Sequence, residues 1–197
     1  MTYRVDPIYS TPVYYSIVND WQSINYGISK VLDKVNFEIK EDWGKTHYIS
    51  TDFSNKSSTI LKDLGLNKLT KEIDSHIKQY CSELEFNVKE YVLSSWLTKF
   101  EKGNYAHIHN HAHADISGVS YYKTNGEDGE IFFEPPVPWF KTSICYEKWR
   151  RRWMYTPKEG KILLFPGWLE HGVKTNLTDN VRMSLSFNVC FKHLIYQ

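Results

Sequence analysis

The chain has 197 residues, a formal net charge of +1 at pH 7 and a sequence pI of about 7.7. This near-neutral balance provides no global basic field, which argues against bulk attraction to nucleic acid or membranes as the main function. The mean hydropathy is -0.50, and no apolar run approaches the roughly 18 residues that a membrane span needs, so an integral membrane protein is not expected.

The length fits a single domain, 1–197, that can bury a core without disulfides or a structural metal. The three cysteines, Cys81, Cys145 and Cys190, are odd in number and lack metal-binding spacing, which favours a reducing compartment. The first residues lack the apolar core of a secretory signal. We therefore expect a cytoplasmic protein.

Residues 1–87 predict a mostly helical part that packs on the remainder of the chain. Asn19 and Asp20 can cap a helix, because Trp21, Ile24 and the apolar residues that follow share one helical face. A second apolar stripe at spacings of three and four follows Asn67, which is a candidate cap for another helix. The polar segment 50–59 between these two helices indicates a loop.

Residues 88–197 predict strands. Short β-branched and aromatic runs alternate with turn residues, as in VKEYVLSSWLTKF, DISGVSYYKT, GEIFFEPP, GKILLFPGW and VRMSLSFNVCF. Helices followed by many short strands predict an α+β, mainly β protein, a sandwich or barrel braced by N-terminal helices. Residues 137–157 are too long for a plain hairpin and are interpreted as an insertion.

Four histidines lie within seven residues: His107, His109, His111 and His113, with Asp115 two residues further on. On an extended strand these side chains would all project from one face. Imidazole nitrogens and a carboxylate that converge on one face are what a divalent metal needs. A polar strand facing solvent is the alternative, although dense histidine tracts usually indicate metal.

Two downstream segments offer partners for this tract. An apolar strand, 162–165, ends at a Pro-Gly turn, and His171 follows it as a candidate ligand. Eleven residues later, Arg182 and Ser184 share the polar face of a strand, where a guanidinium and a hydroxyl can clasp a carboxylate. Taken alone, His171 would be interpreted as a histidine without a metal role, and Arg182 as one member of an exposed ion pair. The histidines without such a context are interpreted as ordinary ones: His47, His76 and His193.

Together these motifs resemble the iron(II)/2-oxoglutarate oxygenases, and more narrowly the "putative 2OG-Fe(II) oxygenase" group common in marine phages and bacteria. The motifs are H-x-H, S-G-V-x-Y, G-x-[IL]-L-x-F-P-x-W-L-x-H and R-x-S-x-S-F-N, within residues 103–122, 129–136, 157–173 and 182–189. The resemblance covers roughly the last 100 residues and implies a double-stranded β-helix, a cupin-like jelly roll, as the catalytic core, 88–197. A phage-encoded member would act in the cytoplasm of the host cell.

The resemblance implies iron(II) held between two histidines and usually a carboxylate. His109 and His171 are then the two histidines, and no catalytic residue beyond the metal ligands is implied. Alignment on residues 117–119 puts His109-Asn-His111 where the family has H-x-D/E. His111 and Asp115 therefore compete for the third place.

The resemblance also implies 2-oxoglutarate as co-substrate, with its keto-acid end on the iron and its distal carboxylate at Arg182 and Ser184. Tyr121 would offer it a hydroxyl. We therefore expect a hydroxylase that uses O2 and couples oxidative decarboxylation of 2-oxoglutarate to succinate with hydroxylation of an organic substrate. A protein or peptidyl side chain is the favoured substrate, by similarity to prolyl hydroxylases.

Two other functions stay open: a cupin-type metalloenzyme that does not use 2-oxoglutarate, and a non-catalytic jelly-roll binding module. The basic and aromatic run 148–153 is interpreted as part of a lid over the site, with an anionic or nucleic-acid substrate as the alternative. No membrane partner is expected. The weak candidates for substrate contact are Trp96, Trp139, Trp149 and Trp153.

Overall fold

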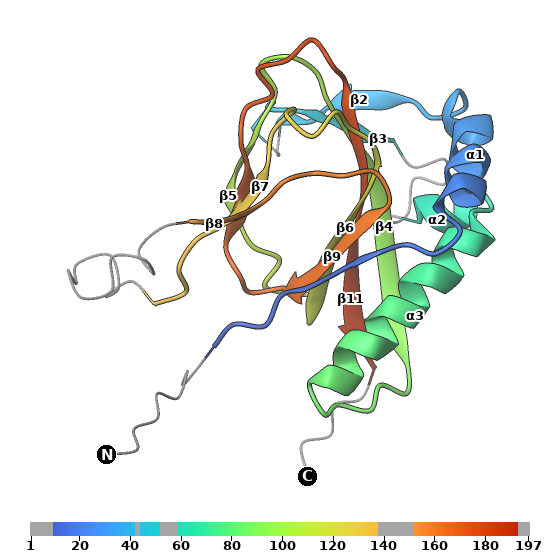
Figure 1. The fold of residues 1–197 in the computed structure, drawn as a ribbon, viewed down its shortest axis with the longest axis vertical. Coiled ribbons are helices and arrows are strands. Elements are labelled where there is room, and N and C mark those ends of the chain that lie inside the picture. The colour runs from blue at the N-terminus through green and yellow to red at the C-terminus, as the bar shows by residue number, and fades with distance from the viewer. Residues whose placement is uncertain (1–9, 42–43, 52–58, 138–151, 193–197) are drawn as a thin grey trace, which may run out of the picture.

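The computed structural model describes residues 10–41, 44–51, 59–137 and 152–192 (Figure 1). In chain order its helices and strands are β1 (Tyr14–Ile17), α1 (Trp21–Leu32), β2 (Phe37–Ile39), β3 (Tyr48–Ser50), α2 (Ile60–Asp63), α3 (Asn67–Glu83), β4 (Tyr91–Phe100), β5 (Ala106–His109), β6 (Ile116–Lys123), β7 (Ile131–Phe133), β8 (Trp153–Tyr155), β9 (Lys161–Pro166), β10 (His171–Val173) and β11 (Arg182–Phe191).

The strands form two antiparallel sheets. The large sheet has the order β1-β9-β6-β11-β4-β3-β2, and the small sheet has the order β5-β10-β7-β8. The two sheets face each other, with α1 and α3 on the outer side of the large sheet (Figure 1). The mainly β, jelly-roll fold expected from the sequence is therefore confirmed.

Strand β11 shows why these residues form these layers. It lies between β4 and β6, so both of its edges are hydrogen-bonded to neighbouring strands. Met183 and Leu185 point to the core shared with the helices, whereas Arg182, Ser184 and Ser186 line a cavity between the sheets. The alternation of apolar and polar residues along this strand thus separates packing from the site.

The main hydrophobic core lies between the helices and the large sheet. Each of its large apolar side chains contributes roughly 1.5–3 kcal/mol when fully buried. A second, smaller cluster lies between the two sheets and packs beside the cavity. The first cluster includes Ile24, Ile28, Ile73, Ile77, Leu97, Leu164, Leu185 and Phe187, and the second consists of Val119, Tyr121, Ile131, Phe133, Leu163, Phe165 and Leu169.

Residues 1–87 contain more strand than the sequence pattern indicated. Besides the helices, this part supplies β1, which pairs with β9, and β3, which pairs with β4. These strands have three or four residues, too few for a period of two to be recognised. Asn67 is also not a cap but the first residue of α3, after Leu66 at the N-cap position.

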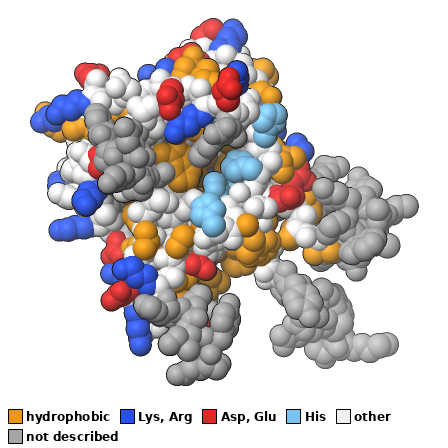
Figure 2. Space-filling view, turned by 180° about the vertical axis from the view of Figure 1, so that it is seen from behind, with side chains coloured by type: hydrophobic (Ala, Val, Ile, Leu, Met, Phe, Trp, Pro, Cys, Tyr) orange, Lys and Arg blue, Asp and Glu red, His pale blue; other side chains and the backbone are white. Residues whose placement is uncertain are grey.

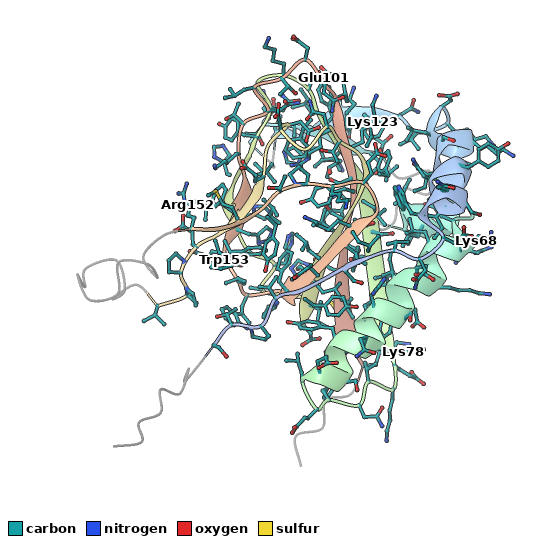
Figure 3. All side chains as sticks on the ribbon, viewed as in Figure 1. Lys68, Lys78, Glu101, Lys123, Arg152 and Trp153 are labelled. Atoms are coloured by element: carbon teal, nitrogen blue, oxygen red, sulfur yellow. The ribbon has the colours of Figure 1, made fainter. Side chains whose placement is uncertain are left out.

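The expected insertion, 137–157, lies mostly outside the described residues. Its described end forms β8, which pairs with β7 at the edge of the small sheet. Arg152 and Trp153 lie there, at the edge of the molecule (Figure 3). Within the described part of the chain, no helix is long and apolar enough to cross a membrane.

Candidate functional site

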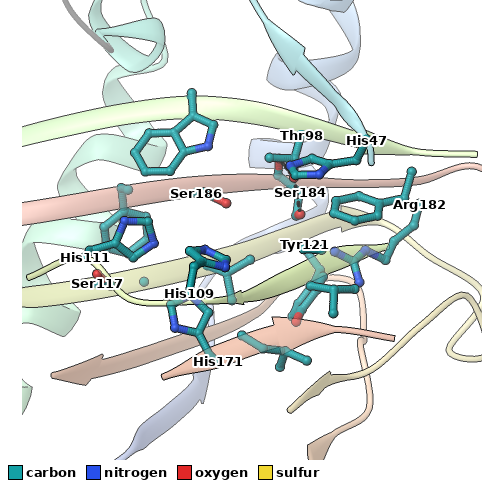
Figure 4. Close-up of a pocket in the computed structure, with 18 of the residues that line it drawn as sticks. His47, Thr98, His109, His111, Ser117, Tyr121, His171, Arg182, Ser184 and Ser186 are labelled. Carbon is teal, nitrogen blue, oxygen red and sulfur yellow. Dashed lines mark hydrogen bonds between the residues drawn. The ribbon is translucent and has the colours of Figure 1, made fainter. Parts of the chain in front are cut away.

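A cavity lies between the two sheets and carries most of the polar residues that the sequence singled out (Figure 4). The volume that the centre of a water-sized molecule can occupy in this cavity is about 70 Å³. This is several times the roughly 10–15 Å³ that one bound water needs, so the cavity can hold a small ligand. Three histidines lie at one end and Arg182 lies at the other (Figure 4).

The histidines are His109, His111 and His171, whose donor nitrogens all lie within 4.8 Å of one another. Antiparallel pairing of β5 with β10 sets His109 directly opposite His171, and their ring centroids are 4.4 Å apart. The His111 ring centroid lies 5.0 Å from that of His109 and 5.3 Å from that of His171. Three convergent imidazoles can hold a divalent metal ion. In the space-filling view, histidine side chains gather on one face beside apolar ones (Figure 2).

The first and last of these histidines are oriented by backbone carbonyls. His109 Nδ1 lies 2.7 Å from His107 O, and His171 Nδ1 lies 2.9 Å from Leu169 O. A carbonyl oxygen can only accept, so in each ring Nδ1 carries the proton and donates. The Nε2 atom of each neutral ring then keeps its lone pair for a metal, as is usual for histidine ligands.

Burial also keeps two of these rings neutral. Burial, together with the neighbouring His109, lowers the pKa of His171 to about 3. Burial and the neighbouring His109 and His113 lower the pKa of His111 to about 4. Because metal binding needs an uncharged imidazole, neither ring has to lose a positive charge at neutral pH.

Asp115 is not part of this cluster. Its Oδ2 accepts a hydrogen bond from Phe191 N at 2.7 Å, and the residue is exposed. The expectation that all four histidines and Asp115 share one strand face is wrong, because β5 ends at His109. The chain then turns, with Ala114 N donating to His111 O at 2.8 Å. The alternation of faces stops where the strand stops.

A close contact between two turns positions His111. His111 N donates to Gly167 O at 2.8 Å, which ties this turn to the Pro-Gly turn after β9. A Cβ atom on Gly167 would lie 2.0 Å from Ala114 O and 2.8 Å from His111 O. Glycine is therefore required at 167 because backbone passes directly over it.

Gly167→Ala should displace His111 and weaken metal binding. Its methyl group meets backbone oxygens, so the turn that carries His111 has to move. We expect cobalt(II) affinity to fall roughly 10–100-fold, the scale for lost support of a metal ligand. The matched control is Gly27→Ala, where no described atom beyond its chain neighbours and its own helix backbone lies within 4 Å of the new Cβ. Isothermal titration of both variants checks this, and equal affinities would contradict it.

Arg182 lies at the opposite end of the cavity and is almost fully buried. Its Nη1 donates to Gly129 O at 2.7 Å, but its Nε has no hydrogen-bond partner. The guanidinium carbon lies 4.2 Å from the Phe100 ring centroid and 5.5 Å from that of Tyr121. Burial lowers the pKa of the guanidinium, because desolvation penalises a charge. Among the described residues no carboxylate forms an ion pair with it, so this end of the cavity favours an anionic ligand.

Tyr121 and Ser184 line the same cavity as Arg182, with which they were expected to bind the co-substrate. The Tyr121 hydroxyl is buried and has no hydrogen-bond partner. Burial raises its pKa to about 12, so the hydroxyl stays protonated and can donate. Ser184 Oγ lies 2.8 Å from Thr98 Oγ1 on the neighbouring strand. A guanidinium and two hydroxyls therefore border the same end of the cavity.

His47 is a cavity residue that the sequence pattern did not reveal. It precedes β3, whose pairing with β4 brings it onto Phe100, with ring centroids 4.5 Å apart and planes at 8°. Burial and the nearby Arg182 lower its pKa to about 4. No local signal marks it, because only the pairing of two strands distant in sequence places it here.

The candidate substrate tryptophans differ in position. Trp96 lines the cavity beside His111, with ring centroids 6.0 Å apart. Trp153 is 68% exposed on β8 and does not line the cavity. Trp139 and Trp149 lie outside the described residues.

Residues 94–188 match a protein-family model described as "Putative 2OG-Fe(II) oxygenase". No curated protein matches the chain. Among solved structures, the chain is similar to a Pseudomonas putida prolyl-4-hydroxylase, with a TM-score of 0.63, 9% identity, and 93% of this chain and 94% of that chain covered.

Two other solved structures resemble the chain to a similar degree. HygX from Streptomyces hygroscopicus with nickel and 2-oxoglutarate bound gives a TM-score of 0.65 at 12% identity, over 92% of this chain and 84% of that one. A Trichoplax adhaerens prolyl hydroxylase in complex with a hypoxia inducible factor peptide fragment gives a TM-score of 0.61 at 13% identity, over 90% of this chain and 83% of that one. At these identities the likeness concerns the fold.

Proposed function

Residues 94–188 belong to the 2OG-Fe(II) oxygenase family, and from this premise we propose that the chain is an iron(II)- and 2-oxoglutarate-dependent dioxygenase that hydroxylates an organic substrate. The overall reaction converts 2-oxoglutarate, O2 and a C–H bond of the substrate into succinate, CO2 and an alcohol.

The three histidines suit the metal. His109, His111 and His171 would hold iron(II), with His111 rather than Asp115 in the third place, because only His111 has its donor atoms near the other two. Neutral nitrogen donors bind iron(II), and also manganese(II), cobalt(II) and nickel(II). When bound, iron(II) and 2-oxoglutarate together supply the activation of O2.

The observation that carries the proposal is the buried Arg182 in the same cavity as the histidines. The Nε of this guanidinium and the nearby Tyr121 hydroxyl both lack a hydrogen-bond partner. A negatively charged hydrogen-bond acceptor would satisfy both groups. The distal carboxylate of 2-oxoglutarate is such a group, and its keto-acid end would lie toward the histidines. A cupin-type enzyme that does not use this co-substrate would not need the buried arginine.

The remaining cavity residues shape the site and exclude water from it. The rings of Phe100 and Phe165 border the cavity, and Phe165 lies 4.7 Å from the His171 ring between centroids. Ser184 would join Arg182 in binding the carboxylate, with its hydroxyl oriented by Thr98. Apolar walls exclude water and strengthen the electrostatic attraction between the ligand and the guanidinium.

A protein or peptidyl side chain remains our proposed substrate class. The support is the similarity of the fold to two prolyl hydroxylases, one of them in complex with a peptide fragment. Trp96 is the candidate contact inside the cavity, and Trp153 would contact parts of the substrate that extend outward. The insertion 137–157, which contains Trp139 and Trp149, is our proposed lid.

The proposed function is tested by adding 2-oxoglutarate to the iron(II) protein under anaerobic conditions. We expect a new visible absorption band from charge transfer between iron and the bound keto acid. On admission of O2 the band should decay and succinate should form, slowly even without substrate. A protein that binds iron(II) but shows neither the band nor succinate would contradict the proposal and favour the cupin-type alternative.

A further inference from the structure

The third histidine of the cluster is held differently from the other two. His109 and His171 each place Nδ1 against a backbone carbonyl, which fixes the proton on that nitrogen. His111 Nδ1 instead lies 3.4 Å from the side-chain amide of Asn188. An amide has both a donor and an acceptor end, so it does not fix which nitrogen of His111 carries the proton.

Asn188 is itself positioned by the sheet. It lies on β11 directly opposite Ser117 of β6, and both residues are buried. Ser117 Oγ donates to Asn188 Oδ1 at 2.9 Å, which turns the NH2 group toward His111. In this arrangement Nδ1 of His111 accepts, and the proton of the neutral ring is on Nε2.

This arrangement does not suit a metal bound through Nε2 of His111. Ligation needs the Nε2 lone pair, so the proton has to be on Nδ1, which then needs an acceptor. Half a turn of the Asn188 amide about its Cβ–Cγ bond would present Oδ1 to Nδ1. The NH2 group would then donate to Ser117 Oγ, since a hydroxyl can accept as well as donate.

Building on the proposed iron site, we propose that Asn188 is the positioning residue of the third histidine and that its amide turns over when metal binds. The proton balance is simple: Nε2 releases a proton to solvent, Nδ1 takes one up, and the ring stays neutral. The number of hydrogen bonds among His111, Asn188 and Ser117 is the same before and after. His111 therefore has to change the nitrogen that carries its proton when metal binds, whereas His109 and His171 already carry theirs on Nδ1.

Zinc(II), a diamagnetic probe, allows the turn to be tested by NMR in the wild-type chain labelled with 15N-histidine. In the metal-free protein we expect the proton on Nε2 of His111 but on Nδ1 of His109 and His171. After zinc(II) is added, all three rings should carry it on Nδ1. If metal-free His111 already carries its proton on Nδ1, the proposed rotation of the Asn188 amide is wrong.

Two substitutions of similar size test the positioning role. Asn188→Leu removes the amide that contacts His111 Nδ1, so zinc(II) affinity should fall roughly 10–100-fold. Asn188→Asp keeps an acceptor for Nδ1–H and should restore affinity to within a few-fold of wild type, a rescue that a merely structural role would not give. Titration against a competing chelator measures both, after circular dichroism shows that they fold.

The possible failures are distinguishable. A wild-type chain that binds zinc(II), with Asn188→Leu binding it equally well, would overturn this inference and leave the proposed function standing. A wild-type chain that binds no zinc(II) would overturn the metal site on which both proposals depend.

Discussion

Replacing His171 by alanine should abolish stoichiometric binding of iron(II), and replacing His109 should do the same. Each change removes one of three donors whose nitrogens lie within 4.8 Å of one another. The loss should exceed about 100-fold, because even an outer partner of a ligand contributes roughly 10–100-fold. Anaerobic equilibrium dialysis with metal analysis measures it. The domain should stay folded, since neither ring belongs to the hydrophobic clusters.

The same measurement decides the third ligand. His111→Ala should lose iron(II) to the same extent, whereas Asp115→Ala should bind it as wild type does. Asp115 accepts a hydrogen bond from Phe191 N and is therefore expected to matter for stability rather than for metal. If Asp115→Ala lost the metal and His111→Ala kept it, the cluster would be wrongly assigned. Tight binding of one ferrous ion by the double variant of His109 and His171 would contradict the site altogether.

Arg182→Ala should weaken 2-oxoglutarate binding by roughly 10–150-fold. A charge-assisted, two-pronged contact to a carboxylate contributes about 1.5–3 kcal/mol, and about 1.4 kcal/mol corresponds to a factor of ten. Arg182→Lys should recover part of the affinity, because it keeps the charge and loses the planar fork. Iron(II) affinity should hardly change, since Arg182 lies at the other end of the cavity (Figure 4).

Titration of the anaerobic absorption band with 2-oxoglutarate measures these dissociation constants. The matched control is Arg152→Ala, which removes an arginine from the edge of the small sheet, outside the lining of this cavity (Figure 3). It should leave the 2-oxoglutarate dissociation constant unchanged. An unchanged constant in Arg182→Ala would remove the support that the buried arginine gives to the oxygenase assignment.

The sequence predicted those parts of the site that depend on local periodicity and on motif order. Arg182 and Ser184 share a strand face that lines the cavity, as their spacing of two indicated. His109 and His171 were expected together from the order of motifs, and the pairing of β5 with β10 places them opposite each other. Strands of eight to ten residues, such as β6 and β11, show their pattern clearly.

What could not be predicted depends on contacts between distant segments. His47 reaches the cavity only through the pairing of β3 with β4. The expectation for Asp115 depended on a strand continuing past His109, and sequence periodicity does not show where hydrogen bonding stops. The hydrogen bonds of Asn188 to His111 and Ser117 join three segments of the chain. None of these is visible in a local pattern of residues.

The strand order of the large sheet has a consequence for how the protein is made. β1 forms one edge of this sheet and β2 and β3 form the other, while β11 lies near the middle. β1 therefore has no partner until β9 emerges, and such non-local pairing folds slowly. Arg182 and Asn188 both belong to β11, so the cavity is incomplete on a nascent chain that lacks this strand. We expect metal loading to follow the emergence of β11 from the ribosome, with the strands that still lack partners exposed to chaperones in the interval.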